Sequence, residues 1–274
     1  MHDLSSALAG KSIFRNIDLL RAYHQLAVAS DDAPKTGVIT PFGLFEYLRM
    51  PFGLNNAAPT FRRFIHVVTL GLESIYPYLD DILIASSSDD EHLRRVEALF
   101  QRLTQPVVIV NFDKCKLSQS SIDFPRHKVS SAGIEALQDR IQALKDYPAL
   151  ISFKQLHRFI GLVNCYRDFI PNCASIMLPM TDLLRGNQRC FHFPDDDKLA
   201  FEKLKNAIFN IALLAHPDPA ALLSLKTETL DTTVGAFLQQ LIGHRWIPLG
   251  IFSKRLNLPN RVTAPSVGNY ERSI

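Results

Sequence analysis

The first 112 residues alternate short hydrophobic runs with polar turns and two amphipathic stretches. Runs with the length and composition of strands lie at residues 12–18, 22–28, 44–50, 75–79 and 82–85. Ala58-Pro59-Thr60 opens a stretch of helical spacing that carries Phe61, Phe64, Ile65 and Val68. Ser87-Ser88-Asp89 offers caps for a second helix, with Leu93, Val96, Leu99, Phe100 and Leu103. Strands with helices between or beside them predict an α+β layer.

The pattern of residues 113–190 is mostly helical. Leu137, Ile141 and Leu144 form one stripe, and Ser152 offers a cap for a helix with Leu156, Phe159, Ile160 and Val163. Gly186-Asn187-Gln188 and the polar run at 194–197 interrupt the pattern, which predicts a boundary near residue 190. A further helix, with Leu199, Leu204 and Ile208 facing inward, precedes strand patterns at 221–226, 234–240 and 245–252.

Two adjacent carboxylates interrupt an apolar stretch. Tyr78-Leu79-Asp80-Asp81 is flanked by hydrophobic residues on both sides, so a largely buried hairpin is expected there. Buried carboxylates need a partner, and a divalent cation is the natural one. Asp18, near the end of the strand at 12–18, could converge on the same ions from a second element. The alternatives are a solvated Asp-Asp turn and, for Asp18, a helix N-cap or strand-end turn.

Several longer segments, taken together, resemble the reverse transcriptase region of a gypsy-type LTR retrotransposon Pol polyprotein. They follow the order of that family across almost the whole chain. The segments are IDLLRAYHQLAV (17–28), PKTGVITPFGLFEYLRMPFGLNNAAPTFRRF (34–64), YLDDILIASSSDDEHLRRV (78–96), KCKL (114–117), FIGLVNCYRDFIPN (159–172) and LPMTDLLRG (178–186).

The resemblance implies an α+β polymerase. Residues 1–112 are expected to form a palm, an antiparallel sheet backed by helices, and residues 113–190 a helical thumb and connection. Residues 191–274 are expected to form a partial, degenerate RNase H-like α/β domain. Nucleotide cyclases, which share a palm-like fold, fit poorly because the segments after residue 100 match polymerases specifically.

The resemblance also assigns a site. Asp18 and Asp80 are implied as the main ligands of two Mg²⁺ ions, with Mn²⁺ as a substitute, and Asp81 as an auxiliary ligand. Tyr23 is implied to stack beneath the incoming sugar. Phe52, Gly53 and Tyr78 are implied to line the substrate site. The implied partners are a primer-template nucleic acid and deoxynucleoside triphosphates. Phosphate contacts are expected from Lys35, Arg49, Arg62 and Arg63, although plain surface solvation explains each of these equally well.

Three departures from the family pattern bear on activity. The chain begins 17 residues before Asp18, so the fingers subdomain is expected to be largely missing. The primer-grip strand reads Phe124-Pro125-Arg126-His127, and proline resists a central strand. Glu228 stands where the RNase H pattern has its first aspartate, in a stretch that runs to Asp231, and Glu271 is a doubtful match for a later acid. These departures predict that polymerase activity of the isolated chain is weak or absent. The alternative to a polymerase is an inactive transposon-derived fragment with at most nucleic-acid binding.

Composition adds few constraints. Hydrophobic residues make up 47% of the chain and charged residues 21%, which is typical of a folded globular protein. The net charge of +3 permits nucleic-acid binding without arguing for it. The four cysteines form no CxxC pair, which favours free thiols in a reducing compartment. Without a signal peptide or a run of about 20 apolar residues, no membrane association is expected, and the location is expected to be intracellular, cytoplasmic or nuclear.

Overall fold

The computed structural model describes residues 2–185, 190–211, 213–230, 232–256 and 269–272. The chain forms two compact units. The N-terminal unit comprises residues 10–125, and the C-terminal unit comprises residues 1–9 together with residues 126–274. The predicted subdomain boundaries at 112 and 190 are a different division of the chain, and they stay a prediction.

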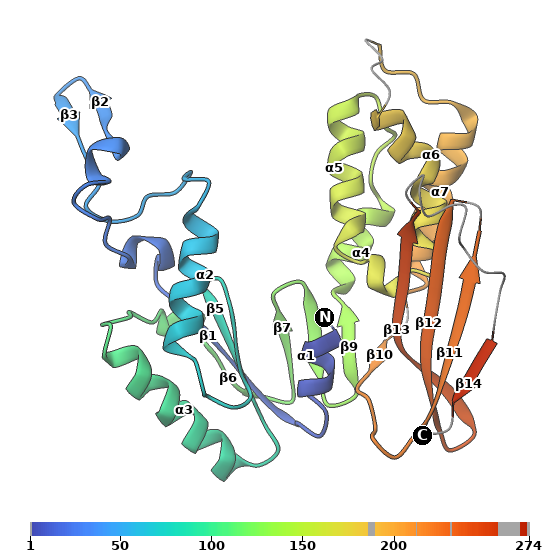
Figure 1. Cartoon of the computed structure of the whole chain (residues 1–274), viewed down its shortest axis with the longest axis horizontal. Coiled ribbons are helices and arrows are strands. Elements are labelled where there is room, and N and C mark those ends of the chain that lie inside the picture. The colour runs from blue at the N-terminus through green and yellow to red at the C-terminus, as the bar shows by residue number, and fades with distance from the viewer. Residues whose placement is uncertain (1, 186–189, 212, 231, 257–268, 273–274) are drawn as a thin grey trace. The chain divides into compact units, whose positions relative to one another are not determined.

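An antiparallel sheet in the order β4-β5-β1-β6 is the centre of the N-terminal unit (Figure 1). Its strands are β1 (Ile13–Asp18), β4 (Ile75–Tyr78), β5 (Asp81–Ser86) and β6 (Lys116–Gln119), and β7 (Ser121–Phe124) follows. Two helices pack on it, α2 (Ala57–Val68) and α3 (Asp89–Thr104). The core between sheet and helices includes Ile17, Ile82, Ile84, Phe61, Ile65, Leu99 and Leu103.

The two faces of this sheet differ in chemistry because side chains alternate along a strand. Ile17 in β1, together with Ile82 and Ile84 in β5, faces the helices and is fully or almost fully buried. Asp18 in β1 and its cross-strand partner Asp81 therefore project from the opposite face. The apolar period that builds the core therefore places these acidic side chains on the face opposite α2 and α3.

Two predicted strands of the N-terminal unit are wrong in whole or in part. Residues 22–28 contain a 3₁₀-helix, η1 (Ala22–Gln25), in place of a strand. Of residues 44–50, only the first two belong to a strand, β3 (Gly43–Phe45), which pairs with β2 (Val38–Thr40). Ala22, at the start of η1, and Met50, which lies outside the strands, are both buried in the core, so their burial did not require strands. A short apolar run does not reveal which kind of backbone carries it.

The C-terminal unit combines helices with two antiparallel sheets. Its helices are α1 (His2–Ala7), α4 (Gln138–Lys145), α5 (Phe153–Asn164), α6 (Cys173–Arg185) and α7 (Asp195–Phe209), with the 3₁₀-helix η4 (Arg167–Phe169). The small sheet contains β8 (His127–Ser130), β9 (Gly133–Ala136) and β10 (Leu214–Ala215). The larger sheet, in the order β13-β12-β11-β14, contains β11 (Leu222–Thr229), β12 (Thr233–Ile242), β13 (Arg245–Arg255) and β14 (Asn269–Arg272).

The helical core of this unit lies between α4, α5, α6 and α7. Leu156, Phe159, Met180, Phe201 and Leu204 are among its buried side chains. The expected cap is present, because the Ser152 side chain accepts a hydrogen bond from the Gln155 backbone N–H at the start of α5. Residues 113–190 are less helical than predicted, since four short strands precede α4, and the predicted inward residue Leu199 is 55% exposed.

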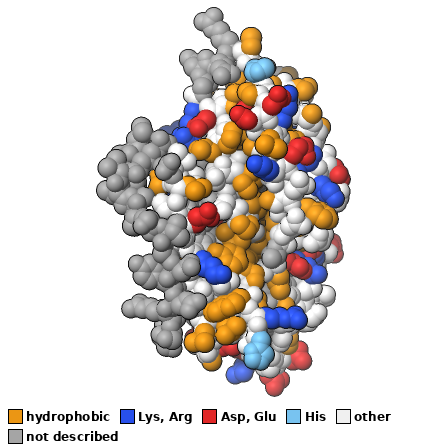
Figure 2. All heavy atoms as spheres, turned by 90° about the vertical axis from the view of Figure 1, so that its right-hand side faces the viewer, with side chains coloured by type: hydrophobic (Ala, Val, Ile, Leu, Met, Phe, Trp, Pro, Cys, Tyr) orange, Lys and Arg blue, Asp and Glu red, His pale blue; other side chains and the backbone are white. Residues whose placement is uncertain are grey.

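The larger sheet keeps hydrophobic side chains at the surface. Figure 2, which views the side where β11–β14 lie in Figure 1, shows hydrophobic side chains along the middle of the face, with charged side chains beside them. Leu225, Trp246 and Phe252 are among the exposed hydrophobic residues of these strands. Among the described helices, none has the length and apolar character needed to cross a membrane.

Candidate functional site

The β4–β5 hairpin and β1 position the predicted acidic residues. Tyr78 pairs with Asp81 across the hairpin, which leaves Leu79 and Asp80 as a two-residue loop. Leu79 has a φ of 54°, and the turns that close such loops need a positive φ at this place. The Leu19 N–H donates a hydrogen bond of 2.7 Å to the Asp80 carbonyl. The loop that carries Asp80 is therefore fastened to the end of β1.

Asp18 and Asp81 lie directly opposite each other in the β1–β5 ladder. Directly opposed residues of an antiparallel pair have Cβ atoms about 5 Å apart, on the same face of the sheet. Asp18 and Asp81 are half-buried, and Asp80 in the loop is exposed. The structure therefore sets Asp18 opposite Asp81, with Asp80 in the adjoining loop, while their catalytic roles stay predictions.

The pKa of Asp81 is raised above its usual range. Burial of the carboxyl is the largest cause, and the neighbouring charges of Asp80 and Asp18 add to it. A hydrogen bond from Asn16 and the charge of Lys114 act in the opposite direction. A cation bound between these acids would relieve both the desolvation and the mutual repulsion.

Asn16 supports this group from the same face of β1. Its Nδ2 donates a 2.7 Å hydrogen bond to Oδ1 of Asp81. Its own Oδ1 is buried and has no hydrogen-bond partner among the described residues. Carboxylate and amide oxygens are the donors that Mg²⁺ prefers, so the donor set fits a hard divalent cation. Within the described part of the chain, however, no three Asp, Glu, His or Cys side chains already stand together as a metal site.

Tyr23 lies beside the predicted nucleotide loop. It sits on η1, and its ring contacts Phe52 and Phe61 edge-on, with 5.6 Å between centroids in each pair. Phe52 is 66% exposed. Gly53 has a φ of 93°, and a Cβ there would meet nothing within 4 Å. Backbone conformation, rather than close approach, is what requires glycine at this position.

The other predicted contact residues are less distinctive. Tyr78 is 39% exposed, and its ring lies 6.3 Å from that of Phe124. Lys35 forms an exposed ion pair with Asp32, and Arg49 donates a hydrogen bond to the Gln25 carbonyl. Arg62 and Arg63 are exposed on α2. Their roles in binding phosphate stay predictions.

Only the middle of the predicted primer-grip strand is a turn, since Phe124 and His127 lie in strands. β7 ends at Phe124 and β8 begins at His127, so Pro125 and Arg126 form the turn and interrupt no strand. Pro125 therefore interrupts no strand pairing, because its missing N–H lies in a turn, where no ladder hydrogen bond needs it.

Glu228 lies on β11 opposite Gly235 and is exposed. Asn172 donates a 3.0 Å hydrogen bond to its Oε2. Asp231 lies outside the described residues. Glu271 pairs with Ser224 through the backbone of β14. Glu228 is therefore held by an amide, and the predicted loss of the RNase H acid set stays a prediction.

Sequence reasoning missed two residues that organise the site. Asn16 is one, and its position two residues before Asp18 on a strand was a usable signal. Gln25 is the other, because its side-chain amide bonds to the backbone of both Leu20 and Ile109 and fastens η1 to a distant segment. No local pattern could indicate that second link.

Comparison with known families gives two matches. Residues 2–129 match the family described as reverse transcriptase (RNA-dependent DNA polymerase). Residues 193–265 match the RNase H-like domain found in reverse transcriptase.

Curated relatives are transposon polyproteins. The chain is 35% identical to the retrovirus-related Pol polyprotein from transposon 297 of Drosophila melanogaster, over 94% of this chain and 24% of the relative. It is 33% identical to the transposon Tf2-3 polyprotein of Schizosaccharomyces pombe, over 94% of this chain and 19% of the relative. The chain thus spans a quarter or less of the length of these relatives.

Solved structures of a foamy viral protease-reverse transcriptase share the fold. The structure in complex with an RNA/DNA hybrid has a TM-score of 0.78 at 19% identity and covers 95% of this chain and 35% of that chain. The structure in complex with double-stranded DNA has a TM-score of 0.75 at 19% identity, covering 96% of this chain and 55% of that chain.

Proposed function

Since the chain belongs to the reverse transcriptase family through residues 2–129, we propose that it acts as an RNA-directed DNA polymerase that extends the 3′ end of a primer. The observation that carries this proposal is the register of β1 against β5. It sets Asp18 opposite Asp81, with Asp80 in the adjoining loop. Nucleotidyl transfer needs carboxylates from separate elements at one place, and the sheet supplies them.

The family depends in general on divalent metal ions, and we propose that Asp18 and Asp80 hold two Mg²⁺ ions here. When bound, such ions neutralise charge on the attacking and leaving oxygens. Asn16 keeps Asp81 oriented beside them through the 2.7 Å hydrogen bond. Tyr23, braced by Phe52 and Phe61, presents a ring against which the sugar of a deoxynucleoside triphosphate can pack.

A second candidate function is nucleic-acid binding without turnover. The observation in its favour is that, among the described residues, no three candidate ligands already stand together as a metal site. Phosphoryl transfer rests mostly on positioning and charge neutralisation, so a palm with a loose metal site would bind its substrate and turn it over slowly.

Primer extension separates the two candidates. The chain is incubated with a primed RNA template, Mg²⁺ and deoxynucleotides, and Asp80→Asn serves as the matched variant. A polymerase is expected to extend the primer, with a loss of at least about 100-fold in the variant. Strand binding is measured in parallel by fluorescence anisotropy. Binding of the primed template without extension, equal in both proteins, would favour the binding function instead.

A further inference from the structure

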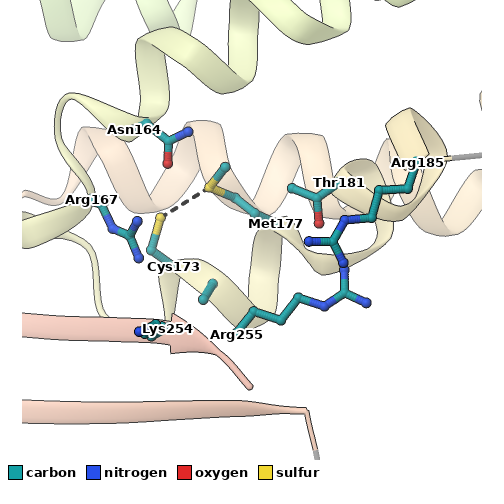
Figure 3. Close-up of a pocket in the computed structure, with 9 residues that line it drawn as sticks. Asn164, Arg167, Cys173, Met177, Thr181, Arg185, Lys254 and Arg255 are labelled. Atoms are coloured by element: carbon teal, nitrogen blue, oxygen red, sulfur yellow. Dashed lines mark hydrogen bonds between the residues drawn. The ribbon is translucent and has the colours of Figure 1, made fainter. Parts of the chain in front are cut away.

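A pocket that lies wholly within the C-terminal unit collects four cationic side chains. It has a volume of about 270 Å³ and is bounded by η4, α6 and the end of β13 (Figure 3). Arg167, Arg185, Lys254 and Arg255 line it, together with Asn164, Thr181, Cys173, Ala174 and Met177. None of these lining residues is acidic, so the pocket is strongly positive.

Most of this charge has no carboxylate partner among the residues that the structure describes. Arg255 forms an ion pair with Asp182. Arg167 donates a hydrogen bond to the backbone carbonyl of Ser253, which fixes the guanidinium and leaves its charge in place. In the part of the chain that the structure describes, neither Arg185 nor Lys254 forms an ion pair. Three of the four cations therefore lack a carboxylate partner there.

The floor of the pocket is apolar. Cys173 and Met177 are buried, and their sulfur atoms lie 3.4 Å apart. Burial raises the pKa of the Cys173 thiol to about 11, so the thiol is neutral and unsuited to act as a nucleophile. Attraction between ions is stronger next to a surface of low dielectric than in bulk water.

The arginines are arranged as an anion site would need. In Figure 3 the guanidinium groups of Arg185 and Arg255 point toward one another, and that of Arg167 lies beyond Cys173. Arg255 is already paired with Asp182, so the charge without a carboxylate partner among the described residues is that of Arg167, Arg185 and Lys254. A guanidinium group presents a planar fork of N–H donors that matches the oxygens of a phosphate, and Thr181 and Asn164 add neutral donors.

We propose that this pocket binds a phosphate group of a nucleic-acid strand. Its volume of about 270 Å³ lies below the range of about 300–1,000 Å³ for sites that enclose drug-sized ligands, so it suits a single phosphate group. Arg185 and Lys254 are exposed, so a strand can reach both cations from solvent. The choice of a strand over a free ion rests on the proposed function, for which nucleic acid is the substrate.

The test compares two double variants of the full chain. Arg185→Gln with Lys254→Gln removes two pocket cations, and Lys154→Gln with Lys203→Gln removes two exposed cations from α5 and α7 that do not line the pocket. Anisotropy of a labelled 20-nucleotide strand gives the affinity at several salt concentrations. The pocket variant is expected to bind about tenfold more weakly, with a salt slope smaller by about 1 to 2, and the control within about twofold of the unmodified chain. Equal affinities for the two variants would overturn the proposal.

A second arm distinguishes the source of the phosphate. Thermal unfolding is followed in inorganic phosphate and in chloride at equal ionic strength. Stabilisation by phosphate that the pocket variant loses, with strand affinity unchanged, would overturn the strand assignment in favour of a free ion. The proposed function has its own test, primer extension with the Asp80→Asn variant, so its failure can be told apart from a failure of the pocket proposal. Loss of extension with pocket-dependent strand binding intact would leave the pocket proposal standing.

Discussion

Asn16 sets the orientation of Asp81, although it is not itself an acid. Because its amide donates to a carboxylate that burial and two neighbouring acids disfavour, the hydrogen bond favours the charged form of Asp81. The same contact fixes the side chain on the face that it shares with Asp18. Asn16 is therefore a positioning residue rather than a catalytic one.

Removing this amide should weaken metal binding. For Asn16→Ala we expect about tenfold weaker binding of Mn²⁺, since groups that orient metal ligands typically contribute about 10- to 100-fold in affinity. Titration followed by electron paramagnetic resonance gives the affinity. Asn206→Ala, an exposed amide on α7, is the control and should bind as the unmodified chain does. An Asn16→Ala protein that binds Mn²⁺ normally would show that Asp81 needs no such support.

At Glu228 we expect no RNase H chemistry. Its carboxylate accepts a hydrogen bond from Asn172, and glutamate is one methylene longer than the aspartate of the family pattern. A shift of about 1 Å in a catalytic group can cost about 100-fold in rate. Incubation with an RNA/DNA hybrid should release no RNA fragments from the unmodified chain, and Glu228→Ala should not differ from it. Cleavage that disappears in Glu228→Ala would refute this.

Among the elements, β8 and η4 pack together around the ring of His127, which lies on β8. The His127 ring stacks on Phe169 at 5.2 Å and contacts Tyr166 edge-on. Its Nε2 is buried and forms no hydrogen bond within the described residues. Burial, together with the charge of Arg126, lowers the pKa of His127 to about 4. The packing of these elements therefore requires a neutral imidazole.

This packing should make the C-terminal unit sensitive to acid. The unfolded chain takes up a proton at His127 near pH 6.5 and the folded unit only near pH 4, so this contribution is complete above pH 6.5 and is lost as the pH falls toward 4. The loss is on the order of 2 kcal/mol. Urea unfolding at several pH values measures it.

Two variants isolate the contribution of His127. In His127→Phe, which keeps the ring stack, the fall in stability between pH 6.5 and 4 should be smaller by that amount. His157→Gln changes an exposed histidine on α5 and should follow the unmodified chain. Parallel pH profiles for all three proteins would contradict the assignment to His127.

At the scale of the whole molecule, a notable surface feature is the apolar hairpin of the N-terminal unit. Ile39 and Phe42 at the β2–β3 hairpin are 87% and 90% exposed, and Leu48 beyond it is 77% exposed. Large apolar side chains with this much exposure favour association, because contact with another chain removes them from water. The chain should therefore associate with itself as its concentration rises.

Charged residues in place of these exposed apolar side chains should suppress the association. Phe42→Lys with Leu48→Lys is expected to keep the chain monomeric at concentrations where the unmodified chain self-associates. Size-exclusion chromatography with light scattering gives the mass. Leu93→Lys with Ile151→Lys adds the same charge at two other exposed positions and serves as the control. Equal masses for both double variants would show that the hairpin is not responsible.

Local patterns in the sequence were enough to predict several elements. The strands at 12–18, 75–79 and 82–85 correspond to β1, β4 and β5, because dense apolar runs between turn residues leave few alternatives. Ser88 and Ser152 marked the starts of α3 and α5 correctly, since a capping side chain bonds within its own first turn. The adjacent acids Asp80 and Asp81 could also be identified from the sequence alone, because two charges that interrupt an apolar run are a local feature.

Tertiary structure alone decided what these elements bring together. Three features depend on pairing between distant segments: the register that sets Asp18 opposite Asp81, the hydrogen bond from Asn16 to Asp81, and the link from Gln25 to Ile109. The same holds for η1 in place of a strand at residues 22–25, and for the cationic pocket, whose arginines come from three separate segments. A periodic pattern determines which face of an element is buried. It does not determine which neighbour covers that face, because many pairings bury similar apolar area and only side-chain packing and satisfied hydrogen bonds select one of them.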